Sequence, residues 1–127
     1  MIFNKVTVSA MIKLRRIYDP EEPGEGYRVL VDRLWPRGVS REEASWHEWM
    51  KEVAPGNELR KWYGHDPSKW NSFKAKYRKE LSSRHDLLLR LKNLESVHGT
   101  LTLLYSSKER EINNAVALRD LLLHTDD

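Results

Sequence analysis

Two short apolar runs dominate the pattern of hydrophobic and polar positions along the chain. Residues 27–31, Tyr-Arg-Val-Leu-Val, form the first run, and residues 100–105, Thr-Leu-Thr-Leu-Leu-Tyr, form the second. Apolar runs of about four to eight residues, bounded by turn-forming residues, are typical of strands buried inside a sheet. Residues 12–17 instead alternate apolar and polar side chains, which predicts a strand with one solvent-facing side.

An acidic, turn-rich segment, residues 19–26, connects the alternating strand to the first buried strand. It is eight residues long, whereas parallel pairing of successive strands usually needs a crossover of about a dozen residues or more. Its length therefore favours a hairpin, in which the two strands are antiparallel neighbours. A parallel arrangement stays open at this point.

A capping box predicts a helix after the first buried strand. Glu43 follows Ser40 at the spacing at which the two side chains bond the first turn of a helix. The apolar positions that follow recur at helical spacing, so a buried stripe is favoured over aromatic rings that stack on bases. His47 falls outside this stripe and is expected to be exposed. The stripe consists of Trp46, Trp49, Met50 and Val53.

Three further helices are predicted in the middle of the chain. Residues 58–63 indicate a short helix that Gly64 stops. Asp66 is expected to cap the next helix, with Pro67 at its first position. A leucine-rich helix follows, with Asp86 as its expected cap. The buried stripe of the helix after Pro67 comprises Trp70, Phe73, Tyr77 and Leu81.

The last helix is predicted to begin at a second capping box, formed by Ser106 and Glu109. The order of elements is then two strands, several helices, one strand and one helix. This order predicts an α/β fold: a single small domain with a small, mostly parallel or mixed sheet that several helices pack against. The two buried strands are expected to be parallel neighbours. The buried positions of the last helix are Ile112, Ala115, Val116, Leu118 and Leu122.

Polar side chains gather at the carboxyl ends of the two buried strands. Asp32 and Arg33 follow the first strand directly, and Arg37 follows the break at Pro36. Tyr105 ends the second strand. Parallel neighbours would open both loops at one edge of the sheet, where ligands bind in α/β proteins, and guanidinium groups bind planar anions through paired hydrogen bonds. The alternative is an Asp–Arg pair that only holds the loop in place.

Three further residues are candidates for the same cleft. Asn113 and Asn114 fall about two turns into the predicted last helix, whose start would seat an anion. Asparagine is a weak helix former, so two in succession suggest a positional role, and at most one is expected to reach the cleft. His65 follows a helix stop, in a loop, and its reference pKa near neutrality suits an acid–base role. The alternatives are an ordinary polar flank for the asparagines and, for His65, a side chain that bonds a backbone carbonyl and packs on Trp62.

The residues around these candidates resemble a known family. Residues 18–20 (Tyr-Asp-Pro) and 26–38 (Gly-Tyr-Arg-Val-Leu-Val-Asp-Arg-Leu-Trp-Pro-Arg-Gly) are similar to the DUF488 family, in its YeaO-like branch. Residues 59–67, 102–105 and 113–115 continue the similarity in order. The family has no established activity, so the resemblance implies a fold and a set of suspect residues rather than a reaction. Other branches resemble a parallel βαβ arrangement at the first two strands, which leaves their orientation open here.

The resemblance also implies where the domain begins. The usual start of the family falls near Met11, so residues 1–10 are expected to be a flexible N-terminal extension, unless Met11 is the natural start. The single DUF488-like α/β domain is expected over residues 11–124.

Composition limits the possible functions. The 127 residues suffice for one domain that buries a core and holds one cleft. The chain has no cysteine, which excludes disulfides and thiolate chemistry and suits a cytoplasmic location. No apolar run approaches the roughly 20 residues of a membrane span, so no membrane contact is expected. Motifs for dinucleotides, P-loop phosphates, zinc and an activated serine are missing, so no cofactor and no metal are expected.

The positive charge of the chain is concentrated in its middle. The net charge is +3, and residues 60–92 hold ten Lys or Arg against three Asp or Glu. Such a segment is typical of a surface that binds nucleic acid, but it also fits a solvated helix face. Lys69, Lys76 and Lys79 lie opposite the predicted stripe of their helix, which favours the solvated face.

Three functional hypotheses follow. The favoured one is a protein that binds or processes a small phosphate- or carboxylate-bearing ligand in the cleft, with Asp32 and His65 as candidate catalytic groups. The alternatives are weak nucleic-acid binding by residues 60–92 and an interaction subunit without a ligand. Whether the protein is an enzyme, and its oligomeric state, stay open. The residues expected to hold or position the ligand are Arg33, Arg37, Tyr105 and one of Asn113 and Asn114.

Overall fold

The computed structural model describes residues 11–124 of the chain, and the predicted extension over residues 1–10 lies outside them. Within the described residues, four strands form one sheet in the order β1-β4-β2-β3, and every neighbouring pair is parallel. The predicted strands and the parallel pairing of β2 with β4 are confirmed. The strands are β1 (Met11–Arg16), β2 (Tyr27–Leu30), β3 (Glu48–Trp49) and β4 (Thr100–Tyr105).

β4 lies between β1 and β2, so the hairpin favoured for these two strands is wrong. All the residues from 101 to 105 are buried, and a strand that is buried on both faces belongs at the centre of a sheet. The chain passes close to the start of β4 before it enters β2. Gly26 has a φ of +64° there, and a Cβ at this position would lie 2.2 Å from the carbonyl oxygen of Thr100.

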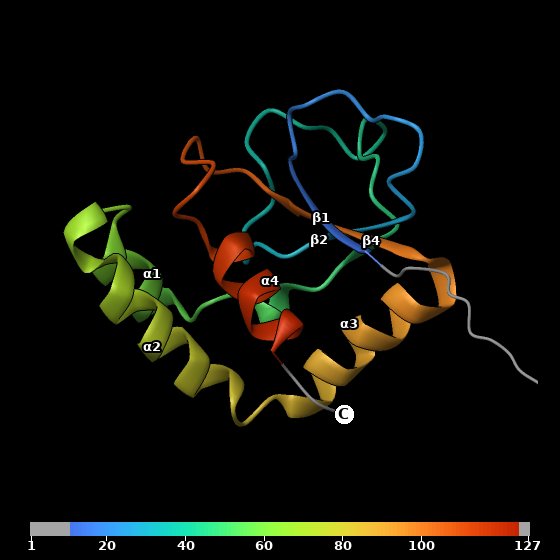
Figure 1. Ribbon diagram of the computed structural model, residues 1–127. Coiled ribbons are helices and arrows are strands. Elements are labelled where there is room, and N and C mark those ends of the chain that lie inside the picture. The colour runs from blue at the N-terminus through green and yellow to red at the C-terminus, as the bar shows by residue number, and fades with distance from the viewer. Residues whose placement is uncertain (1–10, 125–127) are drawn as a thin grey trace, which may run out of the picture.

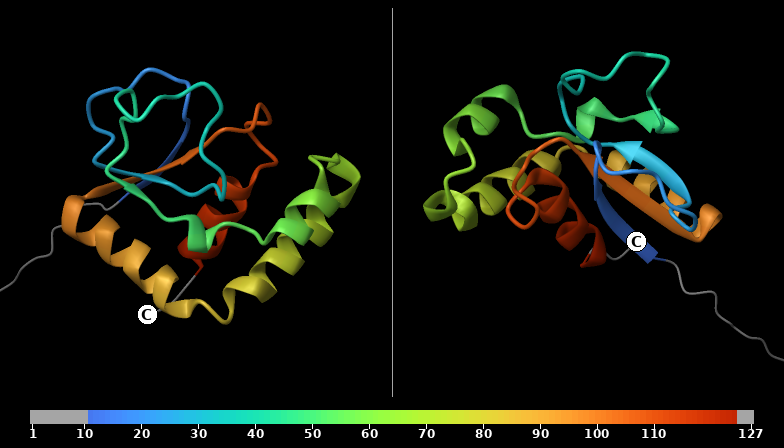
Figure 2. Two further views of the ribbon diagram at one scale, coloured as in Figure 1. Left: turned by 180° about the vertical axis from the view of Figure 1, so that it is seen from behind. Right: turned by 90° about the horizontal axis from the view of Figure 1, so that it is seen from above.

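Helices cover one face of the sheet and loops cover the other (Figures 1 and 2). The main core lies on the helix side and contains Val29 and Leu103 from the sheet. A smaller cluster on the loop side contains Leu30 and Leu104, with Trp46 and Trp49 packed against it. The predicted α/β fold is therefore confirmed. The helices are α1 (Asn57–Tyr63), α2 (Trp70–Leu81), α3 (His85–His98) and α4 (Asn114–Leu123), and 3-10 turns cover Lys51–Val53 and Pro67–Lys69.

The helices in the middle of the chain agree with most of the predictions from the sequence. Gly64 adopts a left-handed conformation, with a φ of 54°, and ends α1 as predicted. The side chain of Asp66 accepts a hydrogen bond from the Ser68 N–H at 3.0 Å and caps the turn that leads into α2. α3 begins at His85, so the prediction that Asp86 caps it is wrong. The predicted stripe of α2 is buried at Phe73, Tyr77 and Leu81, with Trp70 half-buried.

The helix predicted after Ser40 does not form, although its capping box does. The Ser40 N–H donates to the Glu43 carboxylate at 2.9 Å, and the Glu43 N–H donates to the Ser40 hydroxyl at 3.2 Å. The chain then joins the open edge of β2 as β3, where Glu48 and Trp49 pair with β2 residues. Sheet pairing replaces the helix because it satisfies the edge of β2 and lets the tryptophan pack on the loop-side cluster. His47 is exposed, as expected.

The second capping box is also wrong. The N–H and hydroxyl of Ser106 donate to the Asp32 carboxylate, at 2.9 and 2.8 Å, so they are not available to start a helix. Helix α4 begins later, and Asn113 caps it by accepting a hydrogen bond from the Val116 N–H at 2.9 Å. The two asparagines therefore lie at the start of α4 rather than two turns into it.

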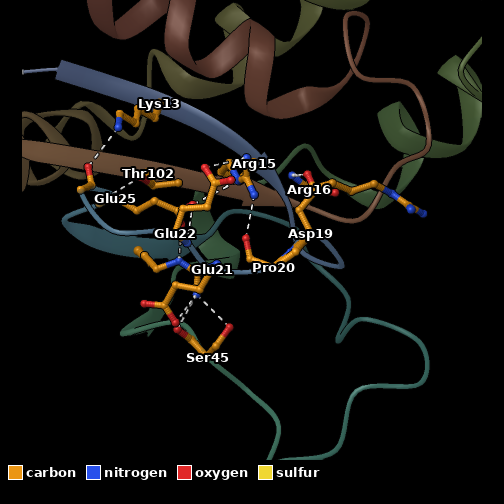
Figure 3. Close-up of polar contacts among 12 residues, drawn as sticks. Lys13, Arg15, Arg16, Asp19, Pro20, Glu21, Glu22, Glu25, Ser45 and Thr102 are labelled. Atoms are coloured by element: carbon orange, nitrogen blue, oxygen red, sulfur yellow. Dashed lines mark hydrogen bonds and ion pairs between the residues drawn. The ribbon is translucent and has the colours of Figure 1, made fainter.

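A buried ion cluster holds the acidic 19–26 segment against the loop side of the sheet (Figure 3). We define it as Arg15, Glu25 and Arg28. Glu25 is 4% exposed and Arg28 is 1% exposed, and they pair at 2.8 Å. Arg15 lies 3.1 Å from the other carboxylate oxygen of Glu25. Arg28 also donates to the carbonyl oxygen of Ser45 at 2.6 Å, which ties a second loop to the same charges.

Candidate functional site

A cavity of about 320 Å³ opens at the carboxyl ends of β2 and β4. Ligands of parallel α/β proteins bind at this edge of the sheet. Residues from the loops after β2 and β4 line this one cavity, so the two loops meet at the same edge of the sheet, as predicted from the two buried strands. Its walls come from the loops after both strands, from the segment before α1, from α1 and its C-terminal loop, and from the helices α2 and α4. The lining residues are Asp32, Arg33, Leu34, Ala54, Pro55, Arg60, Lys61, Tyr63, Gly64, His65, Phe73, Ser106, Ser107 and Asn114.

Asp32 joins the three elements that meet at the cavity. One of its carboxylate oxygens accepts both the N–H and the hydroxyl of Ser106. The other accepts the side-chain amide of Asn114 at 3.1 Å, and this amide also donates to the carbonyl oxygen of Val31 at 3.1 Å. Three protein donors therefore engage the carboxylate, which ties the end of β2 to the end of β4 and to the start of α4.

Arg33 is held by main-chain oxygens and not by Asp32. Its Nε donates to the carbonyl oxygen of Pro55 at 3.0 Å, and its Nη2 donates to that of Ala54 at 3.1 Å. The ion pair that the sequence suggested between Asp32 and a neighbouring arginine does not occur among the described residues. The guanidinium thus keeps its full charge beside the cavity, and its remaining nitrogen, Nη1, has no acceptor among the described side chains and carbonyls.

Two cations of α1 complete the positive wall, and the sequence reasoning missed them. Arg60 and Lys61 are exposed and line the cavity. Arg60 makes one long hydrogen bond, 3.5 Å, to the side chain of Asn57. Lys61 has no ion-pair or hydrogen-bond partner among residues 11–124. The signal that could have found them is their place in the last turn of a helix that stops at Gly64, directly before His65.

His65 lies at the cavity in an unusual backbone conformation. Its φ is +58°, the left-handed region, which costs a residue with a side chain about 1–2 kcal/mol. Its Nδ1 lies 3.5 Å from the hydroxyl oxygen of Ser107, at the outer limit of a hydrogen bond. The ring also packs at 5.7 Å from the Tyr63 ring, rather than on Trp62. Strained residues of this kind concentrate at functional sites.

Three of the predicted ligand-binding residues do not line the cavity. Arg37 is exposed, and its carbonyl oxygen accepts a hydrogen bond from the Tyr18 hydroxyl at 2.7 Å. Tyr105 is 2% exposed, because the alternation of β4 directs it into the helix-side core. Asn113 is fully buried, and its side chain caps α4 and donates to the carbonyl oxygen of Glu109. Only one of the two asparagines, Asn114, reaches the cavity.

Tyr63 closes the cavity on the side of α1. Its hydroxyl donates to the carbonyl oxygen of Ile112 at 2.7 Å. Burial, together with the negative charges of Glu109 and Asp66, raises the pKa of Tyr63 to about 12. The phenol is therefore neutral at physiological pH and acts as a hydrogen-bond donor. It anchors the 106–112 loop, which carries Ser107, to the helix that carries the cations.

The remaining features of the described residues restrict the chemistry. No group of three or more side chains that could hold a metal ion occurs among residues 11–124. No helix in this part of the chain has the length and apolar character of a membrane span. The side chains of the cavity therefore offer cations, hydroxyl groups, one amide, one imidazole and the carboxylate of Asp32.

Comparison with known proteins gives the family. A family model described as "Inactive DUF488-N3 subclade" matches residues 11–126. The chain belongs to the DUF488 family. It is 40% identical over 111 residues to the uncharacterized protein YeaO of Escherichia coli K12, which covers 87% of this chain and 96% of the relative. It is 41% identical over 70 residues to the uncharacterized protein Rv3073c of Mycobacterium tuberculosis H37Rv, which covers 55% of this chain and 59% of the relative. No solved structure matches the chain.

Proposed function

We propose that this DUF488 protein binds a small phosphate- or carboxylate-bearing ligand in the cavity at the carboxyl ends of β2 and β4. One observation carries the proposal. Three cations, Arg33, Arg60 and Lys61, line the cavity, and none of them forms an ion pair within the described residues. The one carboxylate of the lining, Asp32, is engaged by three internal donors.

The charges of the lining decide the sign of the ligand. Three cations, Arg33, Arg60 and Lys61, stand against the one carboxylate of Asp32, which leaves two positive charges in excess. Here the oxygens of Asp32 are bonded to Ser106 and Asn114, and the donors of the three cations remain for a ligand. Cations that line a cleft with low-dielectric walls attract anions more strongly than the same cations on an open surface. The expected ligand is therefore an anion.

Arg33 is already fixed in place before a ligand arrives. The two carbonyl oxygens of Ala54 and Pro55 hold its guanidinium, and both of these residues are buried. A side chain that is already fixed loses little conformational entropy on binding, so more of its interaction energy becomes affinity. Arg60 and Lys61 are exposed and would close on the ligand from α1.

We propose binding without turnover. The matching subclade is described as inactive, and the lining offers little that could drive a reaction. Both carboxylate oxygens of Asp32 are occupied by protein donors. Two pairs of the lining resemble a base and a nucleophile. The atoms of His65 and Ser107 lie 3.5 Å apart, and the Asp32 oxygen that accepts the Ser106 hydroxyl also accepts the Ser106 N–H.

The nucleic-acid alternative has no comparable observation in its favour. Lys69 and Lys76 both lie over the ring of Trp62, at 5.0 and 5.1 Å. The Trp62 ring, on which a base could stack, is therefore already engaged by two cations of the protein. A cytoplasmic location is part of the proposal, supported by the lack of cysteine in the sequence. Cell fractionation of the tagged full chain checks it.

Thermal-shift and calorimetric titrations of the full chain test the proposed function. The probes are inorganic phosphate, succinate and a single-stranded oligonucleotide, with sodium chloride at matched ionic strength as the blank. Phosphate at about 100 times its Kd stabilises the protein by roughly 2.7 kcal/mol. The double variant Arg60→Gln/Lys61→Gln loses two charge-assisted contacts of about 1.5–3 kcal/mol each, and its phosphate affinity falls at least tenfold.

Lys79→Gln is the matched control, because Lys79 is an exposed cation of α2 that does not line the cavity. It should bind phosphate like the parent chain. The proposal is wrong if neither phosphate nor succinate binds, or if the control loses as much affinity as the double variant. Tight binding of the oligonucleotide that Lys79→Gln weakens would favour the nucleic-acid alternative instead.

A further inference from the structure

We infer that the ligand of the cavity is a phosphate monoester that carries one apolar or aromatic group of about the size of a ring, and that Leu34 is the specificity-determining contact for this group. The inference rests on the proposed function and narrows it to one class of ligand. Three properties of the cavity carry it: the number of its cations, the apolar side chains of its wall and its volume.

The number of cations favours phosphate over carboxylate. Arg33 lines the cavity from the loop after β2, whereas Arg60 and Lys61 line it from α1. A carboxylate brings one negative charge and two oxygens. A phosphate monoester brings about 1.5 to 2 negative charges at pH 7 and three strongly accepting oxygens. Three cations against the one carboxylate of Asp32 leave two positive charges in excess, which the phosphate matches more closely than a single carboxylate does.

The wall beside these cations is apolar. Leu34 is 55% exposed although it lines the cavity next to Arg33. Pro55 and Phe73 line the cavity as well. Pro55 and Phe73 are buried, so Leu34 is the apolar side chain that inorganic phosphate would leave in contact with water and that an apolar group on the same phosphate would cover. Small-molecule sites generally combine an apolar wall with a few polar groups that fix the orientation of the ligand.

The volume limits the size of the apolar group. About 320 Å³ is the lower end of the range of roughly 300–1,000 Å³ that small-molecule sites occupy. This space suits a phosphate with one ring or a short alkyl group. It is too small to enclose a dinucleotide or several nucleotides of a strand. The predicted class therefore consists of small aryl or alkyl phosphates.

Calorimetric titration with three probes tests the inference. The probes are inorganic phosphate, glycerol 3-phosphate, whose body is polar, and phenyl phosphate, whose body is an apolar ring. Leu34→Ala is the test variant, and Leu123→Ala is the matched control, because Leu123 is 59% exposed and does not line the cavity. Both leucines are largely exposed, so both variants should fold.

Phenyl phosphate should bind the parent chain about tenfold more tightly than glycerol 3-phosphate, and Leu34→Ala should remove most of this difference. The affinity for inorganic phosphate should change less than twofold in either variant. Equal affinities for the two monoesters, or a difference that survives Leu34→Ala, would overturn the inference while leaving anion binding intact. A failure of all three probes to bind would overturn the proposed function itself, and the inference with it.

Discussion

Removal of Glu25 from the buried ion cluster should destabilise the protein strongly. Arg28 is 1% exposed, and its Nε pairs with Glu25 at 2.8 Å (Figure 3 shows Glu25 with Arg15 and Ser45). In Glu25→Ala the guanidinium keeps only its contacts to Ser45 and a 3.6 Å contact to the half-exposed Glu21. A buried charge that loses its partner costs about 3–5 kcal/mol.

This loss is a large fraction of the roughly 5–15 kcal/mol by which domains of this size are stable. It corresponds to a fall in Tm of about 9–25 °C, since each kcal/mol shifts the Tm of a domain of this length by about 3–5 °C. Urea denaturation followed by circular dichroism measures the free energy of unfolding, and differential scanning calorimetry measures the Tm.

Glu22→Ala is the matched control for this prediction. Glu22 is 63% exposed and lies 3.5 Å from Arg15, so its ion pair is worth about 0–1 kcal/mol. The double variant Glu25→Leu/Arg28→Met removes both buried charges and should lose less stability than Glu25→Ala alone. If Glu25→Ala costs no more than Glu22→Ala, the charges of the cluster are not buried and paired as described, and the reasoning fails.

Three further substitutions test other parts of the structure. Gly26→Ala should lower the free energy of unfolding by more than about 2 kcal/mol, because its Cβ would lie 2.2 Å from the Thr100 oxygen at a positive φ. Gly38→Ala is the control and should cost at most about 1–2 kcal/mol, because Gly38 has a φ of +80° and nothing within 4 Å of its Cβ position. Equal losses of unfolding free energy for the two variants in urea denaturation would contradict this. Asn113→Ala should cost about 1–2 kcal/mol by the same measurement through loss of the α4 cap, and Asn113→Asp should restore most of it. The pKa of Tyr63 is raised from 10.0 to about 12, so the stabilisation by its protonated hydroxyl is complete below pH 10 and is lost as the pH rises through 12. Tyr63→Phe should therefore reduce the fall in the free energy of unfolding between pH 10 and 12. An unchanged fall would contradict the raised pKa of Tyr63.

The parts of the fold that local pattern determines could be predicted from the sequence. β2 and β4 are short runs of apolar residues, and α2 has a regular stripe that ends in Leu81, so burial alone identifies them. The capping boxes were less informative. The one at Ser40 forms its hydrogen bonds without a helix, because the residues that follow pair with the open edge of β2. Pairing between distant segments is not visible in a local pattern.

The candidate site, like the fold, could be predicted from the sequence only in part. Asp32, Arg33, His65 and Asn114 line one cavity, as strand ends and loop positions suggested. The partners of Arg33 could not be predicted, because they are main-chain oxygens of residues 54 and 55, and any residue type carries such oxygens. Arg60 and Lys61 were missed since cations on a helix look like a solvated face until the neighbouring loops are known.

A backbone amide NMR titration with inorganic phosphate shows whether an anion binds in the cavity at the carboxyl ends of β2 and β4. If an anion binds there, the amide signals of Gly64, His65, Ser106 and Ser107 should show saturable shifts, because all four residues line the cavity. The amide signals of the residues around Lys76 and Lys79 on α2 should not shift. Shifts confined to these α2 amides, or no saturable shift at all, would contradict anion binding in the cavity.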